Sequence, residues 1–182
     1  MKQVYRSELR MVNKRKLIFI SYCRSLDAAL ANLIQIELTA RGYRTFLDNK
    51  ILPAGKFESF IANILEVSDS IIVVLSDQSA ERNSQYQKME IDYALKHAKH
   101  IVPVVTPGFN WNKAIIKAPW IASIQTFNAV VVSYDYLEAF LDRLERFVSY
   151  SGKTSIVPLQ KKWWEFWKSK YKMIDISSKQ LR

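Results

Sequence analysis

Apolar runs of strand length alternate with stretches of helical periodicity through the middle of the chain. Runs that are apolar at nearly every position, bounded by polar residues, are typical of strands covered on both faces. Three such runs stand out: "KLIFISY" (16–22), "SIIVVL" (70–75) and "IVPVV" (101–105). They predict buried strands, and "YRTFL" (43–47) predicts a further short strand, each of about five residues.

Helical patterns fill the intervals between these runs. In "AALANLIQIELTARG" the apolar residues Leu30, Leu33, Ile34 and Leu38 recur at helical spacing, and Gly42 suits the end of the helix. Helices are also predicted over "FESFIANILEV" (57–67), over 85–98 and over "YDYLEAFLDRLERFVS" (134–149). A weak fifth strand is predicted at "SIQTF" (123–127).

Strands that alternate with helices predict an α/β fold with a parallel sheet covered on both faces. We expect a flavodoxin-like, doubly wound sheet of five strands in the order 2-1-3-4-5, within a domain spanning residues 17–150. In such sheets ligands bind outside the carboxyl ends of the strands, near the point where the strand order reverses. The loops expected there are 22–27, 48–57, 76–86 and 105–113.

Composition narrows the class of protein. Hydrophobic residues make up 49% of the 182 residues, which is enough for a core. No apolar run reaches the roughly 18 residues of a membrane-spanning helix, and no signal peptide is recognised. The single cysteine, Cys23, excludes an internal disulfide, so a cytoplasmic location is expected. The four glycines form neither GxGxxG nor a P-loop, which argues against those nucleotide-binding classes.

The net charge of +10 is concentrated at the two ends of the chain. The basic N-terminal extension, 1–16, carries +5 and the basic, aromatic C-terminal extension, 151–182, carries +6, whereas 17–150 carries −1. The central domain therefore has no charge-based reason to bind polyanions. Nucleic acid is not favoured as a partner, although nonspecific binding by the ends stays open.

Four segments, in order, resemble the motifs of TIR domains. "FISYCRSLD" is similar to the first strand and turn of that family, and "GYRTFLD" with "LPAGKFE" to its second strand and BB loop. "SDSIIVVLSDQS" resembles the third strand, and "YQKMEIDYALKHAKHIVPVV" resembles the helix with an aromatic-x-x-x-Glu pattern and the strand after it. The resemblance covers about residues 17–150.

The family contains noncatalytic adaptors and enzymes that cleave NAD+. The "AGKFE" loop and Glu90 resemble the NAD-consuming branch, of the bacterial defence type, and this resemblance implies that Glu90 is the catalytic acid. It also implies substrate-binding roles for Asp48, Phe57 and Tyr86, and a mobile loop at Gly55. Tyr86 stands where the family more often has tryptophan. Candidate substrate-binding residues at the end of the first strand are Tyr22, Cys23 and Arg24.

The chemistry expected of Glu90 is coherent by itself. The nicotinamide–ribose bond breaks through an oxocarbenium-like state, as in glycoside hydrolysis. A carboxylate helps by opposing the growing positive charge, and an aromatic residue one turn earlier lies on the same helix face. We expect Glu90 at a pocket edge, with few core contacts. The alternative is a solvated surface residue.

The other candidates also have plain structural alternatives. Tyr86 and Phe57 could be packing residues, Asp48 could only shape its turn, and Arg24 could be solvated or bind a diphosphate. Cys23 is expected to be a small strand-end residue and not a nucleophile. His97 and His100 have the spacing of a metal pair, but neighbouring lysines would repel a cation, so no metal is predicted.

The C-terminal segment "QKKWWEFWKSKYKMI" places aromatic residues on one stripe of a predicted helix, with lysines largely elsewhere. A helix of this kind docks on its own domain or on another subunit, or lies on a membrane surface. Docking is the favoured interpretation, and a membrane surface stays open.

The function predicted from the sequence is NAD+ glycohydrolase or cyclase activity in antiviral or immune signalling. NAD+ is a substrate, and no cofactor is expected. The expected partners are further copies of the chain, through TIR–TIR contacts, and a partner effector protein. The alternative is a noncatalytic TIR–TIR interaction module.

Overall fold

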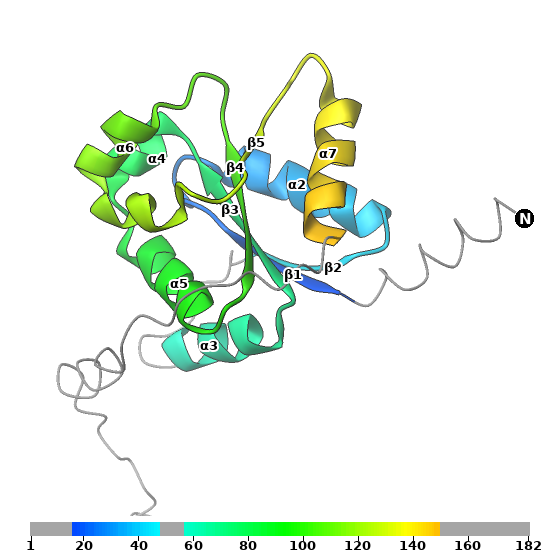
Figure 1. Ribbon diagram of the computed structural model, residues 1–182. Helices are drawn as coiled ribbons and strands as arrows, with labels where there is room; N and C mark the ends of the chain where they lie inside the picture. The colour runs from blue at the N-terminus through cyan, green and yellow to red at the C-terminus, as the bar shows by residue number, and fades with distance from the viewer. Residues whose placement is uncertain (1–15, 48–56, 150–182) are drawn as a thin grey trace, which may run out of the picture.

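The computed structural model describes residues 16–47 and 57–149. Five parallel strands form one sheet in the order β2-β1-β3-β4-β5, which confirms the predicted fold and strand order (Figure 1). The strands are β1 (Leu17–Ser21), β2 (Arg44–Leu47), β3 (Ser70–Leu75), β4 (His100–Val105) and β5 (Val130–Val131).

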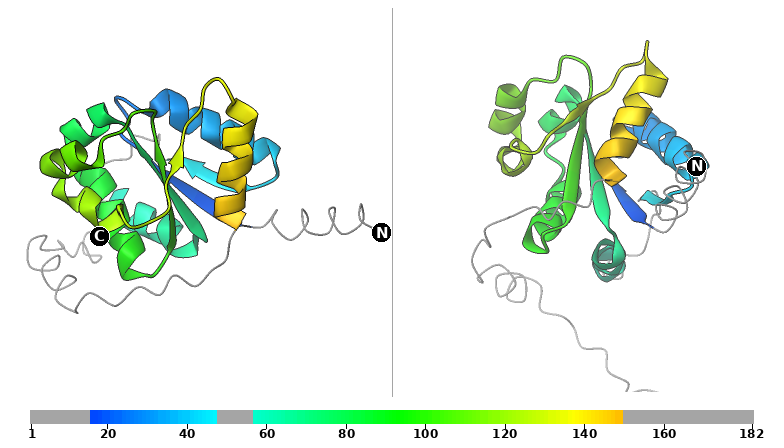
Figure 2. Two further views of the ribbon diagram at one scale, coloured as in Figure 1. Left: turned by 45° about the horizontal axis from the view of Figure 1, so that its top comes forward. Right: turned by 45° about the vertical axis from the view of Figure 1, so that its right-hand side comes forward.

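Helices cover both faces of the sheet (Figure 2). One face carries α2 (Ala28–Ala40) and α7 (Leu137–Ser149), which pack on the strands through one apolar cluster. The second face is covered by α3 (Phe57–Val67), α5 (Gln85–Lys96), α6 (Trp111–Lys117) and the 3-10 helix η1 (Pro119–Ile124). The short helix α4 (Asp77–Arg82) follows β3.

The central strand β3 is the most buried part of the sheet. All six of its residues are buried, and those from Ile71 to Leu75 have no exposed surface. Their side chains alternate between the two apolar clusters, because successive residues of a strand point to opposite faces. The continuous apolar run in the sequence therefore reflects a strand covered on both sides.

The predicted fifth strand at 123–127 is wrong. That region begins in η1, which has a proline, Pro119, in its first turn, and a hydrogen bond from Ser123 Oγ to the carbonyl oxygen of Trp120. The fifth strand lies a few residues later, where Val130 pairs with Val104 of β4. Consecutive β-branched residues suit this extended edge position better than the mixed sequence before it.

Two short helices lie where loops were predicted. In the predicted loop 76–86, the Ser76 side chain accepts a hydrogen bond from Ser79 N and so begins α4. After β4, Asn110 caps α6 in the same way, through Lys113 N. Ser76 and Asn110 are residue types that commonly begin helices. Helices of six and seven residues, however, have too little periodicity to be recognised from the sequence.

Several predictions fall outside the described residues. They concern the basic extension before residue 16, Asp48 and Gly55 of the BB-loop resemblance, and the aromatic segment beyond residue 149. The side chain of Phe57, the first residue of α3, is outside them too. The domain boundaries 17–150 stay a prediction.

Candidate functional site

The carboxyl ends of β1 and β3 form the point at which the strand order reverses. The register pairs Ser21, the last residue of β1, with Val73, so β3 continues for two residues past the end of this pairing. A doubly wound sheet opens a crevice at such a point. Most of the buried polar side chains of the described chain lie around it: Ser21, Asp27, Ser79, Gln87 and Glu90.

Glu90 comes to this end of the sheet from α5. The helix begins at Gln85 because the Ser84 side chain accepts a hydrogen bond from Gln87 N. Its buried residues, Gln87, Glu90, Ile91 and Ala94, recur at helical spacing on one face. Glu90 therefore faces the sheet, and only 6% of its surface is exposed.

The Glu90 carboxyl group is hydrogen-bonded to the end of β1. Ser21 Oγ donates to Glu90 Oε2 at 2.5 Å, and Ser21 itself is 1% exposed. This burial contradicts the alternative of a solvated residue, and it also corrects the expectation of a pocket-edge position with few core contacts. A carboxyl group is costly to bury unless its hydrogen bonds are satisfied, so this position requires a specific reason.

Gln87 is a second buried group of α5 that the sequence interpretation missed. It is 1% exposed, and its Nε2 donates to the carbonyl oxygen of Val74 at 2.9 Å. Its Oε1 is buried and has no hydrogen-bond partner in the described part of the chain. The Ser84 cap together with the spacing from Glu90 could have placed Gln87 on the buried face.

Asp27 is the third buried group and was also missed. It lies before α2 and is 5% exposed, and Ser76 Oγ donates to its Oδ1 at 2.7 Å. Removal from water raises the pKa of Asp27 above its ordinary value, against the opposing effect of hydrogen bonds from Ser76 and Ser79. Within the described ranges its Oδ2 is buried and without a hydrogen-bond partner.

The three predicted residues after β1 differ in their exposure. Tyr22 and Cys23 are buried, at 8% and 4%, whereas Arg24 is exposed. The carbonyl oxygen of Cys23 accepts hydrogen bonds from Leu26 N and Asp27 N, which closes a turn. The burial of Cys23 agrees with a small strand-end residue, and Arg24 is the one of the three that solvent reaches readily.

Tyr86 lies one turn before Glu90 on α5. It is 60% exposed, which disagrees with a packing role in the core. Tyr86 lies in the first turn of α5, at the amino-terminal end of the helix. The structure thus places Tyr86 on the same helical face as Glu90, at its outer end.

The two histidines do not form a site together. His97 ends α5, and its ring stacks on Tyr93 with centroids 4.2 Å apart. Burial, followed by the charges of Lys96 and Lys99, lowers the pKa of His97. His100 begins β4 and lies near Ser70, and in the described ranges no three metal-binding side chains gather.

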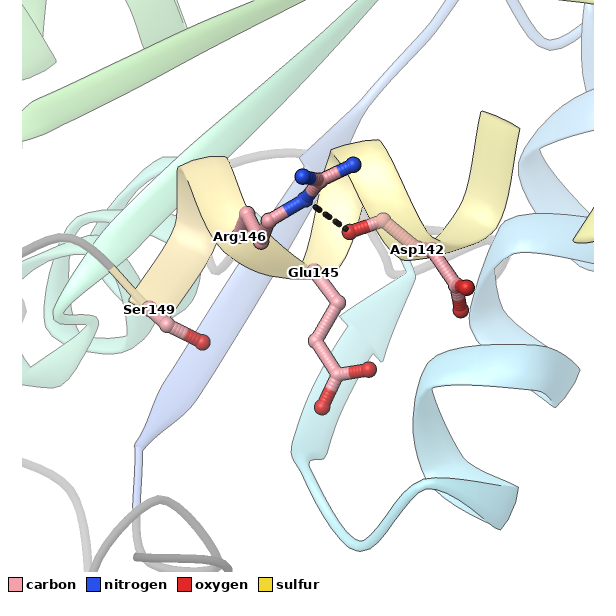
Figure 3. A pocket seen from close by; sticks show the side chains of 4 residues that line it. All are labelled: Asp142, Glu145, Arg146 and Ser149. Atoms are coloured by element: carbon pink, nitrogen blue, oxygen red, sulfur yellow. Dashed lines mark hydrogen bonds between the residues drawn. The ribbon is translucent and has the colours of Figure 1, made fainter. Parts of the chain in front are cut away.

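A hollow of about 640 Å³ lies elsewhere, on α7 (Figure 3). Its described lining residues are Asp142, Glu145, Arg146 and Ser149. Arg41, at the end of α2, contacts Asp142 at 2.6 Å and Glu145 at 2.8 Å. These ion pairs join α2 to α7. The described lining residues of the hollow are partly or fully exposed, unlike the buried polar groups at the ends of β1 and β3.

None of the helices that the structure describes has the length and apolar character needed to cross a membrane.

Comparisons with known proteins agree with this fold. A family model described as a TIR domain matches residues 18–144. The chain is 32% identical over 149 residues to "NAD(+) hydrolase tir-1" of Caenorhabditis elegans, covering 78% of this chain and 15% of that protein. It is also 32% identical over 137 residues to "NAD(+) hydrolase sarm1" of Drosophila melanogaster, covering 72% and 10%.

Solved structures share the fold at lower identity. The TIR domains of the activated Roq1 resistosome match with a TM-score of 0.58 and 15% identity, covering 72% of this chain and 98% of that one. A metazoan TIR-STING receptor from C. gigas matches with a TM-score of 0.57 and 20% identity, covering 86% and 45%. The chain spans less than a fifth of the curated relatives it matches, 15% and 10% of the two above.

The family model covers most of the described residues, and the relatives match over more than two thirds of the chain. The order of the strands agrees with that match. The chain therefore belongs to the TIR domain family.

Proposed function

We propose that this chain cleaves the nicotinamide–ribose bond of NAD+, as an NAD+ glycohydrolase or cyclase. The observation that carries the proposal is the buried Glu90 carboxyl group, hydrogen-bonded to Ser21 at the switch point of the sheet. The names of the relatives, NAD(+) hydrolases, support the same reaction.

Glu90 is the proposed catalytic residue. As nicotinamide departs, positive charge grows on the ribose ring, and a nearby carboxylate lowers the energy of that state. Burial strengthens the effect, because water no longer screens the carboxylate. Nicotinamide leaves as a neutral base, so the reaction has little need of a separate acid. Ser21 donates a hydrogen bond to one carboxylate oxygen of Glu90 and so holds the group at the end of β1.

The substrate-binding residues are proposals as well. Arg24 is exposed at the end of β1 and suits the diphosphate of NAD+, because guanidinium groups bind phosphate oxygens well. Tyr86 offers an exposed aromatic ring one turn from Glu90. Tyr22 and Cys23 are buried, so their proposed role is to shape the base of the substrate site. We retain Asp48, Phe57 and Gly55 from the family resemblance, with NAD+ as substrate and no cofactor.

Two products are possible for the chemistry. Water captures the ribosyl cation to give ADP-ribose, whereas a second nucleophile within the substrate gives a cyclic isomer of ADP-ribose. In both cases nicotinamide takes the electron pair of the broken bond. We propose a role in antiviral or immune signalling in the cytoplasm, with an effector protein as partner.

The decisive experiment compares NAD+ consumption by the wild type and Glu90→Gln, with products identified by mass spectrometry. Glutamine keeps the size and the acceptor for Ser21 but removes the charge, so turnover should fall by about 10²–10³. Glu81→Gln, at an exposed position of α4, is the matched control and should retain turnover. Circular dichroism should report folded protein in all three.

Two outcomes would contradict the proposal in different ways. Equal and clear turnover in the wild type and Glu90→Gln would remove Glu90 from the mechanism. Absence of turnover under crowding and at high protein concentration would favour the noncatalytic TIR–TIR interaction module. That second candidate is supported by the fold shared with the TIR domains of the Roq1 resistosome.

Self-association is part of the proposal, because TIR–TIR contacts are expected to complete the site. Turnover per molecule should then rise with protein concentration. Gly55→Pro should lower turnover while leaving the fold intact, since proline restricts the loop that the family resemblance makes mobile. An unchanged rate in folded Gly55→Pro protein would count against a mobile loop.

A further inference from the structure

Two side chains of α5, three residues apart, attach this helix to two neighbouring strands. Glu90 accepts a hydrogen bond from Ser21 at the end of β1, and Gln87 donates one to Val74 in β3. Ser21 is paired with Val73, so the two attachment points are neighbours across the sheet. The first two turns of α5 are therefore held across the boundary between β1 and β3.

Gln87 bonds to β3 just beyond the point where the pairing of β1 with β3 ends. The carbonyl oxygen of Leu75 accepts a hydrogen bond from Thr106 N, on the β4 side. Successive carbonyl groups of a strand point in opposite directions, so the carbonyl of Val74 points toward β1. The paired part of β1 ends at Ser21, one position short of Val74. The Gln87 carboxamide supplies the donor that a longer β1 would have offered.

Stability explains only one half of the Gln87 carboxamide. Its Nε2 satisfies the buried carbonyl of Val74, which a leucine would leave without this donor, whereas its Oε1 is buried with no partner in the described part of the chain. Buried acceptors without partners are rare in folded proteins, and functional sites are where they are expected. The polar side chain provides what leucine cannot: a directional bond that sets the distance between α5 and β3.

We propose that Gln87 is a positioning residue for the Glu90 carboxyl group. Its bond to Val74 holds the first turn of α5 at the end of β3, and this sets where the carboxyl group lies relative to Ser21. The inference rests on the proposed function for its effect on turnover, but the position of the Glu90 side chain can be measured without it.

The test uses the full chain with Gln87→Leu, which has a similar volume and cannot bond to Val74. Gln85→Leu is the matched control, because Gln85 is exposed two residues earlier on the same helix. We expect Gln87→Leu to lower kcat by about tenfold with KM nearly unchanged, since misplacement of a catalytic group affects the chemical step more than binding. Gln85→Leu should change neither value.

A second measurement is independent of activity. The 13C resonance of the Glu90 side-chain carboxyl group reports its hydrogen bonding, and Gln87→Leu should shift it more than Gln85→Leu does. If the wild type consumes no NAD+ but the resonance shifts, the proposed function fails and the positioning role stands. An unchanged resonance in Gln87→Leu would overturn the positioning role, even if turnover fell.

A conservative variant separates positioning from simple loss of stability. In Gln87→Glu the neutral acid can donate its O–H to the Val74 carbonyl, but the ionised form has no donor. The ratio of variant to wild-type turnover at the same pH should therefore rise as pH falls. A ratio that stays constant across pH would contradict the need for a donor at this position.

Discussion

Two polar regions of this molecule differ in how their charges are satisfied. At the end of α2, Arg41 contacts three carboxylates of α7 at 2.6 to 3.0 Å, and two of these are mostly exposed. At the carboxyl ends of β1 and β3, Glu90 and Asp27 are buried among serines, and polar atoms of Asp27 and Gln87 have no partner among the described residues.

The difference separates a structural cluster from a candidate site. Surface ion pairs contribute little and cost little, because water already solvates both partners. Buried carboxyl groups oppose folding unless hydrogen bonds satisfy them, and such groups gather at functional sites. The hollow on α7, drawn in Figure 3, is lined by partly or fully exposed residues, whereas the buried carboxyl groups lie at the carboxyl ends of β1 and β3.

The largest effect after Glu90→Gln itself is expected for Ser21→Ala. This change removes the donor to Glu90 Oε2 and should lower kcat by about tenfold. The free energy of unfolding should fall by about 1–3 kcal/mol, because a hydrogen bond to a buried carboxyl group is lost. Steady-state kinetics and urea denaturation measure the two effects. Ser123→Ala, which removes a hydrogen bond to the Trp120 carbonyl oxygen in η1 but keeps the contact between Ser21 and Glu90, is the control for kcat. Unchanged kcat would show that this contact does not matter for the reaction.

Asp27→Asn tests the buried carboxyl group through pH. The pKa of Asp27 is raised by burial, so the folded state binds a proton more tightly than the unfolded state does. Stability from this group is therefore present at low pH and is lost as pH rises from its ordinary value, 3.8, through the folded pKa. The free energy of unfolding of Asp27→Asn, measured relative to that of the wild type, should be higher at about pH 7 than at about pH 4. Urea denaturation at both pH values measures this, and parallel behaviour of the two proteins would contradict it.

The smallest effect is expected for Arg41→Met. The substitution removes the contacts with Glu138, Asp142 and Glu145 but keeps much of the apolar stem. The free energy of unfolding should fall by about 1 kcal/mol, because two of the three carboxylates are mostly exposed and such ion pairs are weak. NAD+ turnover should stay within about twofold of the wild type. A large loss of turnover without unfolding would erase the distinction between the two regions.

Much of the architecture was predictable, because it follows from local patterns. The strands β1, β3 and β4 were recognised from apolar runs and β2 from a shorter, partly apolar run, and their parallel order was predicted from the alternation with helices. The fifth strand was misplaced because β5 has only two residues, and its pairing with β4 depends on a partner far away in the sequence. The short helices α4 and α6 were missed because one or two turns carry no clear periodicity.

The sequence by itself determined the family and pointed to Glu90, since motifs and their order are properties of the chain. Only the tertiary structure decided that Glu90 is buried against Ser21, that Gln87 is bonded to Val74, and that Asp27 lies beside Ser76. These pairs are 69, 13 and 49 residues apart, so no local pattern records them. They meet because the strand order reverses between β1 and β3, and the packing of helices on that sheet brings their side chains to one edge.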